Sequence, residues 1–226
     1  MPSANQPNEA LHNPPAPRPQ IEAVKPGRYN RLMPDNESLP LDLDELLAAE
    51  YDYIAQTANQ ANEDRARVSS FYLIAVGSLL AAMFGTQLFD PGFYSRNVNL
   101  MFSGLFMLLT LLGTSTIMQL ARLRAAWYDS AQAMNQLKDF MVSQNESLAN
   151  AFRWTANTLP PRYKTTSVSY YQAAEVALIG GLMFGASTFF LQQAFFSISL
   201  LNWTLSAVAG LSLIYLQLYI YKRALS

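Results

Sequence analysis

One acidic residue of this chain lies where a carboxylate could do chemistry inside a membrane. Glu175 follows Tyr170 and Tyr171 at the start of a long apolar run. A carboxylate at membrane depth is costly and is typical of proton or cation pathways. The same residue also suits a helix N-terminus close to Arg162 and Lys164. We expect an interfacial residue, and a small transporter or membrane enzyme that uses Glu175 is kept as an alternative.

Residue types that support catalysis or metal binding are scarce. The chain has no cysteine, and its single histidine, His12, lies in a proline-rich tail. Disulfides and thiolate sites are excluded, and a histidine-based metal site or catalytic triad would have to use His12. The sequence contains no phosphate-binding loop and no dinucleotide, zinc-protease or serine-hydrolase motif. We therefore predict no enzyme activity, no catalytic residue, no cofactor and no metal.

Hydroxyl side chains on the second apolar run could line a narrow polar path. They are Thr110, Thr114, Ser115 and Thr116. Such groups can equally donate to backbone carbonyls of their own helix, which is the arrangement we expect. An oligomeric channel or pore-forming effector, gated by the part outside the membrane, is the first alternative function.

Four apolar runs carry these residues, and each is about as long as a helix needs to cross roughly 30 Å of hydrocarbon. We predict transmembrane helices at 69–89, 99–120, 173–196 and 200–221, arranged as two hairpins. Apolar residues make up 51% of the chain and charged residues 14%, which is little charge for a soluble domain. The predicted fold class is an all-α membrane protein.

Heptad patterns extend the first hairpin out of the membrane. Seven-residue spacing links apolar residues before the first span and after the second: Leu47, Ile54, Ala61, Trp127, Met134 and Met141. Such a repeat is typical of a coiled-coil seam. No helix breaker separates either repeat from its span, so we predict continuous helices that add 42–68 and 121–143 to the spans. They should pair as an antiparallel stalk in a long hairpin over 41–158. The return segment, 147–158, should contain an amphipathic helix over 148–154.

Polar segments flank these helices. Residues 1–40 hold most of the twelve prolines and cannot bury enough apolar surface to offset their ordering entropy, so we predict a disordered tail. Residues 159–170 include Pro160 and Pro161 and are predicted to link the stalk to a C-terminal hairpin over 171–226.

Small residues spaced four apart mark three of the spans. Such rows permit close approach between helices in a membrane. They are Gly77, Ala81 and Gly85 on the first span, Gly181 and Gly185 on the third, and Ser206 and Gly210 on the fourth. We predict that these rows pack helices and support self-association.

The positive residues predict the orientation. Arg96 lies on one side of the four spans, and the rest of the 15 lysines and arginines lie on the other. The positive-inside rule places both termini and the stalk in the cytoplasm, in the inner or plasma membrane if the chain is bacterial. The net charge of −1 provides no general attraction for nucleic acid.

The expected function is assembly. We predict a non-enzymatic multi-pass membrane protein that acts in assembly or scaffolding through its stalk and its small-residue faces. Its partners would be the lipid bilayer and either further copies of the chain or another membrane protein.

Overall fold

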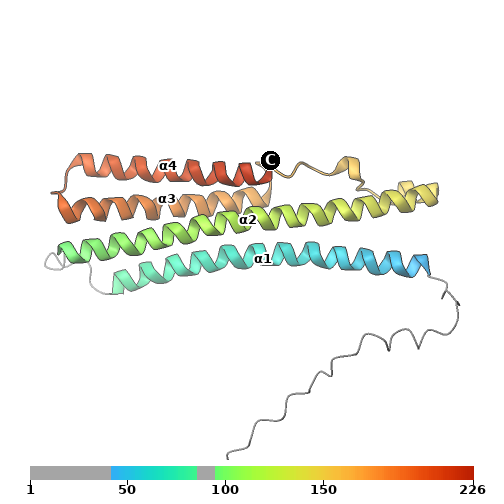
Figure 1. The fold of residues 1–226 in the computed structure, drawn as a ribbon, viewed down its shortest axis with the longest axis horizontal. Coiled ribbons are helices and arrows are strands. Elements are labelled where there is room, and N and C mark those ends of the chain that lie inside the picture. The colour runs from blue at the N-terminus through green and yellow to red at the C-terminus, as the bar shows by residue number, and fades with distance from the viewer. Residues whose placement is uncertain (1–41, 86–94) are drawn as a thin grey trace, which may run out of the picture. The chain divides into compact units, whose positions relative to one another are not determined.

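The computed structural model describes residues 42–85 and 95–226, and in these ranges it contains helices and loops but no strand (Figure 1). The long helices there are α1 (Leu43–Gly85), α2 (Arg96–Gln144), α3 (Val168–Phe195) and α4 (Leu200–Leu225). Two short 3-10 helices, η3 (Glu146–Asn150) and η4 (Ala156–Thr158), lie between α2 and α3. The predicted tail over 1–40 and the predicted end of the first span at 86–89 lie outside the described residues.

The long helices have the length and composition of membrane spans. In the described part of the chain, each of the four is long and apolar enough to cross a membrane. The prediction of four long apolar helices is therefore confirmed, and their composition indicates a multi-pass membrane protein.

Helices α1 and α2 continue well beyond the apolar spans. They contain 43 and 49 residues, and no glycine or proline interrupts α1 before Gly77. At a rise of 1.5 Å per residue, α2 is roughly 74 Å long, more than twice the hydrocarbon thickness of about 30 Å. Part of each helix must therefore lie outside the hydrocarbon.

Helix α2 begins at a side-chain cap and ends where the backbone becomes extended. The Oγ atom of Ser95 accepts a hydrogen bond from the backbone nitrogen of Val98 at 3.4 Å. At the other end, the backbone nitrogen of Asn145 donates to the carbonyl oxygen of Met141 at 3.0 Å, and Asn145 itself is extended. The helix ends at Gln144, one residue beyond the predicted end at residue 143.

Helices α1 and α2 pack side by side and run in opposite directions (Figure 1). Tyr72 of α1 lies against Gly113 of α2, whereas the Nζ atom of Lys138 lies 5.8 Å from the ring centre of Tyr51. Later residues of α1 thus face earlier residues of α2, as the predicted hairpin requires.

Helix α2 is the central helix of the arrangement. It packs against α1 on one side and against α3 and α4 on the other, while α1 and α4 lie at the two edges (Figure 1). In its most apolar stretch 44% of α2 is buried, compared with 33% for α3 and 17% each for α1 and α4. The core is correspondingly centred on α2, where Phe102 and Phe106 lie 5.5 and 5.6 Å from the ring of Phe190.

The helical region has two parts, which differ in how many helices they contain. We call residues 43–68 of α1 and 121–144 of α2 the stalk, and the remaining lengths of the four helices the bundle. Figure 1 shows α1 and α2 continuing past the C-terminal end of α4. The stalk is therefore built from α1 and α2 alone over most of its length, with the connection to α3 beside it.

The connection between the stalk and α3 differs from the predicted amphipathic helix over 148–154. The Oδ1 atom of Asn145 accepts from the backbone nitrogen of Ser147 at 3.1 Å, which starts a 3-10 turn instead of an α-helix. The following backbone is then held by α2. Asn135 donates to the carbonyl oxygen of Thr155 at 3.0 Å, and Asp139 accepts from the backbone nitrogen of Ala156 at 3.3 Å.

Candidate functional site

Small residues bring α3 and α4 into backbone contact. A Cβ atom added to Gly210 would lie 2.7 Å from the carbonyl oxygen of Gly181 and 3.6 Å from the Cα atom of Gly185. A Cβ atom on Gly185 would lie 3.1 Å from the carbonyl oxygen of Ser206. The structure thus brings the predicted packing residues of the third and fourth spans together within one chain.

This contact leaves an apolar groove beside it. Its volume is about 620 Å³, and the rings of Phe189 and Trp203, 4.3 Å apart between centres, form part of its lining. Three glycines and Ser206 also line the groove, and their small or absent side chains leave its space open.

The small residues of α1 are placed differently. A Cβ atom on Gly77 would meet no other described side chain or neighbouring helix within 4 Å. Ala81 is exposed, and Gly85 is the last residue of α1. At Gly77 and Ala81 the structure thus brings no other helix of the described part against this row.

The bundle also holds a buried polar contact that no sequence pattern singled out. Gln217 of α4 is fully buried, and its Nε2 atom donates to the Oγ1 atom of Thr114 at 2.9 Å. Its Oε1 atom has no hydrogen-bond partner among the described residues. The amide packs against Gly180, where an added Cβ atom would lie 2.9 Å from both the Nε2 and the Oε1 atom of Gln217. A lone amide in an apolar run was the only available signal in the sequence.

The hydroxyl groups of α2 are largely satisfied by their own helix. Thr110 donates to the carbonyl oxygen of Phe106 at 2.8 Å, and Thr114 donates to that of Thr110 at 3.0 Å. Thr116 donates to the carbonyl oxygen of Leu112 at 3.0 Å. Each of these hydroxyl groups therefore donates its hydrogen bond within α2. This is the arrangement that we expected in preference to a polar path.

Glu175 is the eighth residue of α3, at the start of its third turn, and its side chain is exposed. The ion pairs of the described part, Arg67 with Asp64 and Arg162 with Asp129, do not include it. Its carboxylate is therefore not directed into the interior of the bundle.

Replacing Glu175 by glutamine is expected to change the free energy of unfolding by less than about 0.5 kcal/mol, because an exposed carboxylate without a partner contributes little to stability. Thermal unfolding of the detergent-purified variant measures this directly. A loss of several degrees in the midpoint would show that the carboxylate is engaged in the native membrane protein.

Two of the predicted seam residues are buried in the structure. Ile54 and Ala61 are 9% and 6% exposed, and Ala58 between them is 4% exposed. The other predicted seam residues are half-buried: Leu47, Trp127, Met134 and Met141. Alanine on this face permits a short distance between the two helices, because it adds only a methyl group to the interface.

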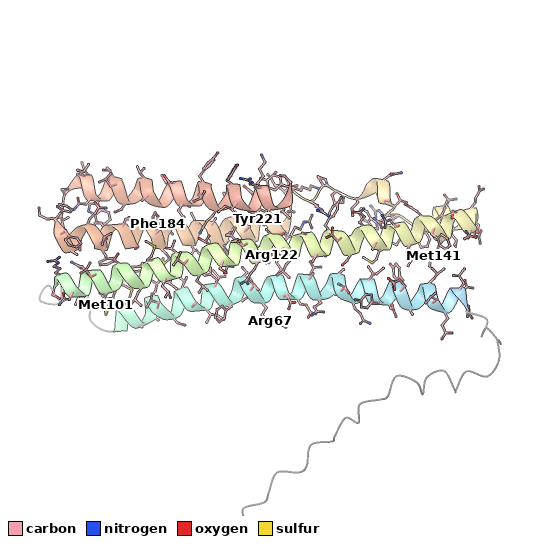
Figure 2. The ribbon with its side chains drawn as sticks, in the orientation of Figure 1. Arg67, Met101, Arg122, Met141, Phe184 and Tyr221 are labelled. Carbon is pink, nitrogen blue, oxygen red and sulfur yellow. The ribbon has the colours of Figure 1, made fainter. Side chains whose placement is uncertain are left out.

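Large apolar side chains lie on the outer surface of the stalk. Leu46 and Tyr53 are seven residues apart on one face of α1 and are 52% and 67% exposed. Phe140 of α2 and Trp154 of the following connection are 42% and 56% exposed. The far end of the stalk, marked by Met141 in Figure 2, has a cavity of about 400 Å³ between the start of α1 and the end of α2.

In the described ranges, no three histidine, aspartate or glutamate side chains lie close enough together to hold a metal ion. Comparison with protein-family models, with curated proteins and with solved structures gives no match to this chain.

Proposed function

We propose that the chain is a non-enzymatic multi-pass membrane protein that acts in assembly or scaffolding, with a cytoplasmic stalk as its contact surface. The observation that carries this proposal is the exposure of Leu46 and Tyr53 on one face of the stalk. Exposed apolar side chains of the bundle can be covered by lipid, but those of the stalk lie beyond the apolar spans. Apolar groups that face water in a cluster are typical of protein interaction sites.

The cytoplasmic position of the stalk is supported by the distribution of charge. Arg67 of α1 and Arg122 of α2 lie at the same level along the helices as Tyr221 of α4, where the stalk meets the bundle (Figure 2). At the opposite end of α2 stands Arg96, the first residue of the helix. An excess of arginine and lysine on one side of the spans favours the cytoplasm for that side.

Self-association is the second part of the proposal. The small-residue row of α3 is already occupied by α4, so it is not free for another copy. Gly77 and Ala81 of α1 are exposed, and a helix of a second copy could approach them closely. We therefore assign contact between copies to α1.

Photo-crosslinking in native membranes tests the stalk surface. A photoreactive amino acid at Tyr53 should give a discrete adduct of higher mass, because this position lies on the exposed apolar face. The same amino acid at Asn59, an exposed polar position of α1, is the matched control. Mass spectrometry of the adduct distinguishes a second copy from a different protein.

Two outcomes would contradict the assembly proposal. Equal, diffuse labelling from Tyr53 and Asn59 would show that the apolar face has no defined partner. Ion flux through liposomes that contain the purified protein would instead favour a channel, since an assembly protein should leave the membrane no leakier.

A further inference from the structure

Arg124 of α2 is a buried cation at the base of the stalk. Its side chain is only 7% exposed, although arginine is rarely buried without a charged partner. The Nε atom donates to the carbonyl oxygen of Arg162 at 3.3 Å, and the guanidinium carbon lies 4.4 Å from the ring centre of Trp127. These contacts position the guanidinium but do not neutralise it, and they leave most of its five N–H donors without an acceptor in the described part.

Arg65 of α1 lies near enough to Arg124 for the two positive charges to repel each other. It is half-buried, and its Nε atom is buried without a hydrogen-bond partner among the described residues. Burial lowers the pKa of Arg124; Tyr221 partly opposes this effect, and the nearby positive charge of Arg65 lowers the pKa further. Burial also lowers the pKa of Arg65. Two like charges therefore share a partly desolvated location, which is costly unless an anion joins them.

The carboxylates closest in sequence to the two arginines are engaged elsewhere. Asp64 precedes Arg65 but accepts a hydrogen bond from Arg67 at 3.0 Å. Asp129, one and a half turns after Arg124, forms its ion pair with Arg162. The chain thus provides acids beside this location without directing either of them to Arg65 or Arg124.

The location matches the depth of lipid headgroups. Arg65 and Arg124 each lie four residues beyond the apolar spans that begin at residue 69 and end at residue 120. At 1.5 Å per residue this places their backbones about 6 Å outside the hydrocarbon. The neighbouring hydroxyl groups of Tyr221 and Ser169 are 2.8 Å apart and uncharged, so they do not replace the missing acid.

We propose that Arg65 and Arg124 together bind a phosphate group, which is provided either by the headgroup of an anionic phospholipid or by free phosphate. Guanidinium groups form paired hydrogen bonds with phosphate oxygens, and two of them can hold one phosphate from two helices. Such a ligand would join α1 to α2 where the stalk begins. The inference does not depend on the proposed stalk partner.

The test uses the full chain in a neutral maltoside detergent without phosphate. Phosphatidylglycerol, diacylglycerol with the same acyl chains, and inorganic phosphate are titrated separately, and the thermal unfolding midpoint is followed. The variants are Arg65→Gln and Arg124→Gln, and the matched control is Arg122→Gln, which removes an exposed arginine of the same helix. If Arg124→Gln does not fold, the half-buried Arg65→Gln still decides the result.

Protection by phosphatidylglycerol and not by diacylglycerol supports the site with lipid as the source. Protection by inorganic phosphate with the same dependence on the variants supports it with free phosphate as the source. In either case the half-saturating concentration should rise about tenfold in Arg65→Gln or Arg124→Gln and stay unchanged in Arg122→Gln. Absence of protection by both phosphate compounds, or equal protection of every variant, would overturn the proposal.

Discussion

Gly210→Ala is expected to destabilise the bundle by about 1 to 3 kcal/mol, the usual range for overpacking a tight contact. The added methyl group would lie 2.7 Å from the carbonyl oxygen of Gly181, which belongs to the backbone of α3. A backbone atom cannot rotate away as the end of a side chain can, so α3 and α4 would have to separate. Thermal or denaturant unfolding in detergent measures the loss.

Gly77→Ala is the matched control for this effect. A Cβ atom at Gly77 has no neighbouring described group within 4 Å, and alanine is intrinsically favoured over glycine in a helix by about 1 kcal/mol. Stability should therefore stay the same or rise slightly. Equal losses at Gly77 and Gly210 would show that helix packing between α3 and α4 is not the cause.

Ile54→Asp is expected to open the stalk, at a cost of about 3 kcal/mol for leaving a charge unpaired in an apolar interface. Ile54 is 9% exposed, between α1 and α2. The chain has no cysteine, so cysteines introduced at the exposed residues Gln56 and Gln132 are the only sites that a spin label can modify. Their distance distribution should become longer and broader in the variant.

Tyr53→Asp distinguishes opening of the stalk from a general effect of added charge. The residue is next to Ile54 but 67% exposed, so the new carboxylate remains in water. The distance distribution should match that of the unsubstituted chain. If Ile54→Asp also leaves it unchanged, the helices are held together by contacts other than the seam.

Features set by local pattern were predictable from sequence. Apolar run length identified the four long helices, and the absence of a breaker identified their continuation past the spans. Boundaries were less accurate where a cap decides them. Helix α3 begins at Val168, five residues before the predicted span, because the Oγ atom of Ser167 accepts from the backbone nitrogen of Tyr170 at 3.2 Å.

Features set by tertiary packing could not be predicted. The three small-residue rows look alike in sequence, and only the three-dimensional structure shows that Gly181 meets Gly210 while Gly77 remains open. Gln217 lacks any spacing signal, and its partner Thr114 is 103 residues away. The connection after Asn145 depends on Asn135 and Asp139 of α2, so its own amphipathic pattern misled the helix prediction.

The central position of α2 also limits how the sequence can diverge. Gly113 accommodates Tyr72 of α1, and the adjacent Thr114 receives Gln217 of α4. Gly113 and Thr114 are consecutive residues that contact two different helices, so neither position is free to accept a larger side chain. Helices α1 and α4 present much of their bundle surface to lipid, where many apolar residues are interchangeable. Of the four long helices in the described part, α2 should therefore tolerate the fewest substitutions.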